Sequence, residues 1–140
     1  MPDDIVIKKL QEFKPDVVAI ASLFSSQVEC GLNVAAAIRE AFPEVLIVFG
    51  GNHATYRCEE LLNSQEAIDF IFRGEADLSF SEFISKYFLG LNFYTVPGLV
   101  RREGNKIIKN PNPENIYNLD ELPDPALHLV AMEKYFEIDM

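Results

Sequence analysis

The chain has 140 residues, of which 49% are hydrophobic and 24% charged, and its formal net charge at neutral pH is −10. These values are typical of a soluble globular domain. The acidic balance argues against nucleic acid and against an anionic membrane as partners, because both require clustered Lys and Arg. No apolar run approaches the ~20 residues of a membrane span and no targeting segment is visible, so a cytoplasmic protein is expected. Cys30 and Cys58 lack the spacing of a metal site, and no metal ligand is predicted.

The first 90 residues alternate between amphipathic helical patterns and short apolar strands. The predicted elements are helices at 3–14, 26–42, 57–63 and 79–88 and strands at 16–21, 45–49 and 68–73. Two helices are expected to begin with a capping box, Ser26 with Glu29 and Ser79 with Glu82. Core-facing positions are expected to include Val6, Leu10 and Phe13 in the first helix and Phe80, Phe83, Ile84, Tyr87 and Phe88 in the last.

The character of the chain changes after residue 90. Residues 99–108 predict a β-hairpin around Glu103-Gly104-Asn105. The Pro-rich residues 110–125 predict an extended surface connector that leads toward a further domain. The cations of this region are expected on the solvated faces of the hairpin: Arg101, Arg102, Lys106 and Lys109.

Strands of five or six residues that alternate with helices predict right-handed βαβ units. The fold class is therefore α/β, a three-layer flavodoxin-like or Rossmann-like parallel sheet with helices on both faces. In such sheets, ligands bind at the carboxyl ends of the strands. Polar residues and glycines follow all three strand patterns, which makes them candidate ligand-binding residues: Ser22 and Ser25, then Gly50, Gly51, Asn52 and His53, then Gly74 and Glu75.

Each of these candidates also has a purely structural interpretation. Adjacent glycines let backbone N–H groups approach a phosphate or ribose, but a tight strand-to-helix turn needs the same residues. Glu75 could bind a ribose hydroxyl or could favour the next helix through its charge. For His53, a loop-stabilising hydrogen bond or a contact with a cofactor tail is expected rather than a metal bond.

Five segments together resemble the second half of a cobalamin-binding domain, of the type fused ahead of radical S-adenosylmethionine (SAM) enzymes. They are Lys14-Pro-Asp-Val-Val-Ala-Ile20, the loop 22–26, Gly50-Gly-Asn-His-Ala-Thr55, Gly74-Glu75 and Asn118-Leu-Asp-Glu-Leu-Pro123. In that family a Ser-x-Leu precedes a Gly-Gly by a fixed gap. Leu23 stands 27 residues before Gly50 and matches, which adds Leu23 to the candidate site, whereas Ala21 replaces the family's serine.

The family's first strand, with its Asp-x-His-x-x-Gly loop, has no counterpart, so the resemblance implies a domain truncated at the front. Residues 1–92 would form the partial cobalamin-binding domain. Residues 93–140 would form the hairpin and connector toward an absent radical SAM domain. The Cys-x-x-x-Cys-x-x-Cys motif of a radical SAM domain is also missing from these 140 residues. SAM and the [4Fe–4S] cluster would therefore bind in the absent domain, and no catalytic residue is predicted in this chain.

The resemblance implies a cobalamin-binding module of a radical SAM enzyme, such as a methyltransferase or the anaerobic magnesium-protoporphyrin ester oxidative cyclase. The expected partners are cobalamin and the radical SAM core of the same polypeptide. The alternative is a non-enzymatic, flavodoxin-like interaction or regulatory domain, although the acid cluster and lysine of a phosphoacceptor domain are not visible. A dinucleotide-binding domain would need G-x-G-x-x-G, which is absent. Without the first strands, the apolar strand 16–21 becomes a sheet edge, which predicts a homodimer.

Overall fold

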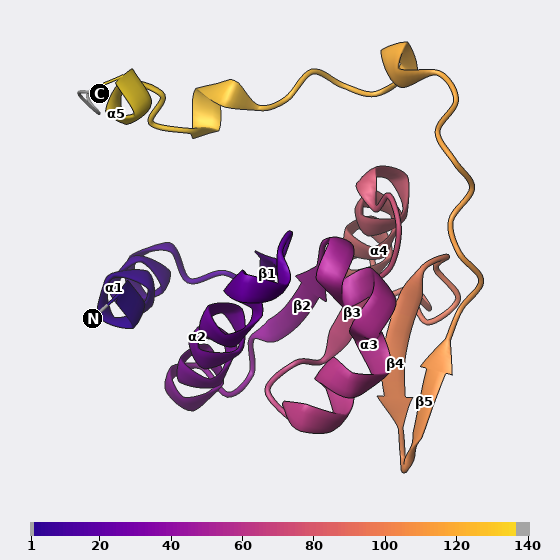
Figure 1. Ribbon diagram of the computed structural model, residues 1–140. Helices are drawn as coiled ribbons and strands as arrows, with labels where there is room; N and C mark the ends of the chain where they lie inside the picture. Colours follow the sequence, from indigo (N-terminus) through magenta and orange to yellow (C-terminus); the bar gives the residue numbers. More distant parts are fainter. Residues whose placement is uncertain (1, 137–140) are drawn as a thin grey trace.

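The computed structural model describes residues 2–136, and three apolar strands form the parallel part of its sheet (Figure 1). These strands are β1 (Val17–Ala21), β2 (Leu46–Gly50) and β3 (Phe70–Phe72). β2 pairs in parallel with both neighbours, so the predicted succession of three parallel strands is confirmed. β3 is shorter than the predicted 68–73, because the segment enters the ladder only at Phe70.

A β-hairpin extends this sheet on the side of β3. β4 (Leu99–Glu103) pairs antiparallel with β3, and β5 (Lys106–Lys109) pairs antiparallel with β4. The sheet therefore has the order β1-β2-β3-β4-β5. The hairpin itself was predicted, whereas its place in the sheet was not, because periodicity does not specify which strands pair.

Helices cover both faces of the sheet, as predicted. α2 (Val28–Ala41) and α3 (Asn52–Ser64) pack on one face, where Ala35 and Leu61 join Phe49 and Ile71 in one apolar cluster. α4 (Asp77–Phe88) packs on the other face, where Phe83 lies against the rings of Phe70 and Phe72. α1 (Pro2–Phe13) packs against α2. Within residues 2–136, no helix has both the length and the apolar character needed to cross a bilayer.

Two residues predicted to face the core lie instead in exposed last turns of their helices. Phe13 is 80% exposed and Phe88 is 62% exposed. In α1 the packed residues are Val6, Ile7 and Leu10, and the helix ends three residues later. The amphipathic pattern thus extends into the last turn of each helix, where the apolar side chain no longer packs against the rest of the protein.

Neither predicted capping box is formed. A 3-10 turn, η1 (Ser25–Gln27), precedes α2, so Ser26 lies inside this turn and not at a helix N-cap. α4 begins at Asp77, and the buried Ser79 lies in its first turn, where its hydroxyl donates to Ala76 O at 3.4 Å. Both patterns lie two residues from the observed helix starts, a common displacement because N-terminal turns tolerate several registers.

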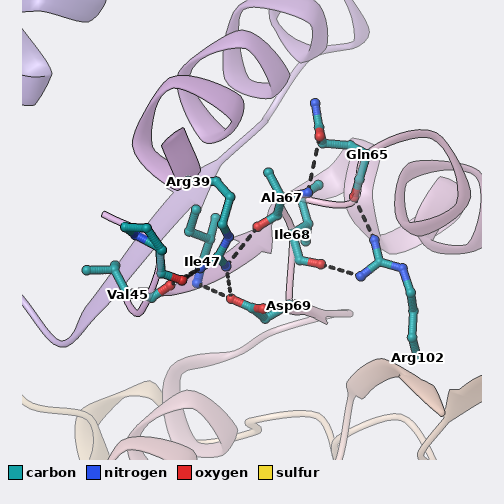
Figure 2. Close-up of polar contacts among 9 residues, drawn as sticks. Arg39, Val45, Ile47, Gln65, Ala67, Ile68, Asp69 and Arg102 are labelled. Atoms are coloured by element: carbon teal, nitrogen blue, oxygen red, sulfur yellow. Dashed lines mark hydrogen bonds and ion pairs between the residues drawn. The ribbon is translucent and has the colours of Figure 1, made fainter. Parts of the chain in front are cut away.

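At the amino end of the sheet, two arginines bind backbone carbonyls (Figure 2), and Arg102 and Asp69 also line a cavity of about 490 Å³. Arg39 donates to Val45 O at 2.8 Å and Ala67 O at 3.1 Å, and it pairs with Asp69, which also accepts from Ile47 N at 2.7 Å. Arg102 donates to the carbonyls of Leu62, Gln65 and Ile68. The prediction of solvated faces is thus wrong for Arg102, because its long side chain turns back over the end of α3; Arg101 is also largely covered, with its side chain 17% exposed.

The chain after β5 leaves the sheet as an extended connector. It contains two 3-10 turns, η2 (Leu119–Glu121) and η3 (Leu127–Leu129), and the short helix α5 (Glu133–Phe136). In Figure 1 it runs across the side of the sheet where the parallel strands end. Tyr117 is 92% exposed and Leu129 is 79% exposed, which agrees with the predicted surface connector.

Candidate functional site

The carboxyl ends of β1 and β2 lie side by side, because Ala21 pairs with Gly50. β1 continues into a loop that carries Ser22, Leu23 and Ser25, and β2 continues through Gly51 directly into α3. The segment from Asn52 to Thr55, predicted as a loop, is the first turn of α3 and not a loop. The parallel pairing therefore brings two predicted groups of residues to the same edge of the sheet.

Gly51 is required by the fold itself. Its φ is 95°, and a Cβ atom at this position would lie 2.5 Å from Ser22 O. The backbone of Ser22 also accepts from His53 N at 3.4 Å and donates to Gly50 O at 2.9 Å, and the Ser22 side chain is buried. Only glycine fits this close approach, so the structural interpretation of a tight strand-to-helix turn holds at Gly51.

Gly50 differs from Gly51 in both respects. Its φ is not positive, and a Cβ atom built there would meet nothing within 4 Å. A side chain at this position would be tolerated by the backbone and by the neighbouring residues of the chain. The missing side chain therefore leaves open space at the carboxyl end of β2, where a ligand could approach the backbone.

His53 links the first turn of α3 to the loop after β1. Ser25 Oγ lies 2.9 Å from His53 Nδ1, and the His53 side chain is half-buried. The expected loop-stabilising hydrogen bond is thus present. When the Ser25 hydroxyl donates to Nδ1, the neutral ring carries its proton on Nε2, which becomes a donor.

A cavity of about 370 Å³ opens between the β1 loop and the start of α3. Four predicted residues line it, Leu23, Ser25, Asn52 and His53, together with Tyr56 and Arg57, which the sequence analysis missed. These two follow Asn52 and His53 by four residues, so they share a helix face with them. Recognition that α3 begins at Asn52 would have found them.

Gly74 and Glu75 lie apart from this cavity. Gly74 N donates to Thr55 Oγ1 at 3.0 Å, and a Cβ atom at Gly74 would be 3.4 Å from Pro113 of the connector. Glu75 is exposed and lines a separate cavity of about 230 Å³ between α4 and the connector. Among the described residues there is no group of three or more His, Cys, Asp or Glu residues that could hold a metal ion.

The family model for the B12 binding domain matches residues 1–84. The chain belongs to the B12-binding domain family. This match covers the elements from α1 to most of α4, including the β1 loop and the start of α3, which border the cavity. The three parallel strands with helices on both faces are the α/β fold that the resemblance implied.

The chain is similar to several curated relatives and to the solved structure of a radical SAM enzyme. An uncharacterized methyltransferase of Pyrococcus horikoshii is 31% identical over 93% of the chain and 28% of its own length. The anaerobic magnesium-protoporphyrin IX monomethyl ester cyclase of Synechocystis is 26% identical over 96% of the chain and 27% of its own length. The structure of the cobalamin-dependent SAM radical enzyme OxsB, with aqua-cobalamin and SAM bound, superposes with a TM-score of 0.77 at 17% identity, over 91% of this chain and 18% of that one.

The domain thus spans less than a third of the relatives it matches. It resembles the B12-binding domains of B12-dependent radical SAM methyltransferases and of the cyclase.

Proposed function

We propose that the chain binds cobalamin at the carboxyl ends of β1 and β2, as one module of a longer radical SAM enzyme. Gly50 carries this proposal, because it is a glycine that the fold does not need at the edge where open α/β sheets bind ligands. Membership of the B12-binding family supplies the identity of the ligand. The cavity and its lining then supply contacts of the right chemistry.

The residues at the edge fit a macrocycle that is apolar on its faces and rich in amides at its rim. Leu23 is 57% exposed and Phe24 is 64% exposed, so apolar side chains are available to contact a corrin face. Ser25, Asn52 and His53 can exchange hydrogen bonds with amide groups. Gly50 allows the backbone to approach the ligand, and Gly51 makes the turn that places Gly50 beside the start of α3. Gly74 and Glu75, which lie apart from this cavity, would contact only a part of the ligand that extends toward the end of β3.

Catalysis belongs to the longer enzyme in this proposal. Cobalamin, when bound, supplies a cobalt centre for the transfer of one-carbon groups or electrons. The domain's own residues bind and orient it, and a separate radical SAM domain holds SAM and the [4Fe–4S] cluster. The reaction class is then methyl transfer or an oxidative cyclisation, as the names of the relatives suggest.

The proposed partners are cobalamin, the radical SAM core and, for the isolated chain, a second copy. β1 pairs on one side with β2, and Val17, Val18 and Ile20 are only half-buried. Neither nucleic acid nor a membrane surface is a proposed partner, in view of the net charge of −10. The proposed location is the cytoplasm.

Titration of the full-length protein with aquacobalamin, followed by visible absorption, tests the proposal. The wild type should bind, and Gly50→Ala should weaken binding about tenfold, because its methyl group occupies the space left for the ligand. Asn63→Ala, near the far end of α3, is the matched control and should bind like the wild type. Absence of any cobalamin binding by the wild type would contradict the proposed function and favour an interaction domain.

A further inference from the structure

The cavity beside the first turns of α3 is lined by side chains that can donate hydrogen bonds to a ligand. His53 and Arg57 line it together with Ser25 and Asn52. The Ser25 hydroxyl lies 2.9 Å from His53 Nδ1, which orients the imidazole; when this hydroxyl donates to Nδ1, Nε2 carries the ring proton and can donate to a ligand. In that tautomer, one side of the cavity offers an N–H donor whose orientation Ser25 holds.

Arg57 supplies a cation four residues farther along the same helix. α3 is kinked at this residue, where φ is −118° and ψ is 25°, so the first turn is set off from the rest of the helix. The guanidinium pairs with Glu60, and the side chains of Arg57 and Glu60 are 58% and 59% exposed. Exposed pairs of this kind contribute little to stability, so Arg57 can exchange Glu60 for a ligand at small cost.

The two donors together favour a negatively charged ligand group. A guanidinium beside an imidazole N–H is suited to an oxyanion, and a phosphate oxygen accepts from both. Cobalamin is surrounded by uncharged amides and carries one anionic group, the phosphodiester of its nucleotide tail. Resting on the proposed function, we propose that Arg57 and His53 form a subsite for this phosphodiester.

Cobinamide, the corrin without the nucleotide tail, provides the test. The full-length protein and its Arg57→Gln variant are titrated separately with aquacobalamin and with diaquacobinamide, followed by visible absorption. Arg57→Gln should lose about tenfold in affinity for cobalamin and change little for cobinamide, because only cobalamin carries the phosphodiester. Lys106→Gln removes an exposed cation of the hairpin and serves as the charge-matched control; it should alter neither affinity.

Each outcome has a distinct meaning. Equal losses for both ligands would overturn the subsite, because Arg57 would then contact the corrin or support the fold. An unchanged cobalamin affinity in Arg57→Gln would also overturn it. Glu60→Gln frees the guanidinium and should leave cobalamin binding equal or tighter, and a weaker affinity would count against the subsite. A wild type that binds neither ligand would refute the proposed function itself.

Discussion

The polar residues at the two ends of the parallel strands differ in how fully the backbone binds them. At the amino end, Arg39, Asp69 and Arg102 are saturated by backbone groups and by one another (Figure 2). At the carboxyl end, Ser25, Asn52 and His53 border an open cavity, and Gly50 faces empty space. Charge alone would have suggested a binding site at the amino end. Both ends border a cavity, of about 490 Å³ at the amino end and about 370 Å³ at the carboxyl end, so it is the bonding partners that distinguish them. The amino-end side chains are bonded to the backbone and stabilise the fold, which makes the carboxyl end the better candidate for a ligand.

The contrast between adjacent glycines gives the largest expected effect. Gly51→Val should lower the free energy of unfolding by about 4 kcal/mol, because its Cβ would collide with Ser22 O and its φ is 95°. Cobalamin binding by the full-length protein should be lost as well. Urea unfolding measures the first effect and visible-absorption titration the second.

Gly50→Ala is the matched control in the same turn, and it should change stability by less than about 1 kcal/mol while it weakens cobalamin binding.

His53→Ala should weaken cobalamin binding less than Gly51→Val does, by about fivefold relative to the wild type. Equal binding losses for Gly51→Val and His53→Ala would contradict this ranking.

The openness of the carboxyl end predicts weak binding by the isolated chain. A cavity of about 370 Å³ encloses only part of a ligand as large as cobalamin, and tight binding requires most of a ligand to be enclosed. Isothermal titration of the 140-residue chain should give an affinity in the micromolar to millimolar range, at least about a hundredfold weaker than that of the full-length protein. Comparable affinities would show that the described residues form a complete site.

The arginines bonded to the backbone at the amino end predict stability effects without binding effects. Arg102→Met should lower the free energy of unfolding by about 2 kcal/mol, because three backbone carbonyls lose their donor. Its cobalamin affinity in the full-length protein should match the wild type. Lys106→Met is the control on the same hairpin, since Lys106 is exposed, and its stability should stay within about 0.5 kcal/mol of the wild type. If Arg102→Met lost cobalamin affinity without losing stability, the amino end and not the carboxyl end would be the binding site.

The lateral edge of the sheet gives the smallest expected effect. The hairpin lies at the opposite side of the sheet from β1, so it does not cover this edge. The isolated chain should form a dimer at tens of micromolar, measured by light scattering, and Val18→Lys should return it to a monomer. A monomeric parent chain would exclude this association, and a Val18→Lys dimer would place the contact elsewhere.

Periodicity and glycine placement by themselves determined the α/β class, the three parallel strands and the strand end that bears the candidate site. These follow from local rules, because apolar runs specify buried strands and parallel strands end at a common edge. The same rules placed Ser25 and His53 at that edge. They did not identify Tyr56 and Arg57 as site residues, because the start of α3 was predicted five residues too late. A Gly-Gly pair gives no signal for where its helix begins.

Only the tertiary structure decided which polar side chains form hydrogen bonds within the fold and which remain available to a ligand. Arg101 and Arg102 have the sequence pattern of a solvated hairpin, yet the packing of β4 beside β3 brings Arg102 to the carbonyls at the end of α3. Gly50 and Gly51 are the same residue type, yet a Cβ atom would collide with Ser22 O at Gly51 and would meet open space at Gly50. Such differences depend on contacts between segments far apart in the chain. Local propensity carries no information about those contacts, because they form only when the folded chain brings distant segments together.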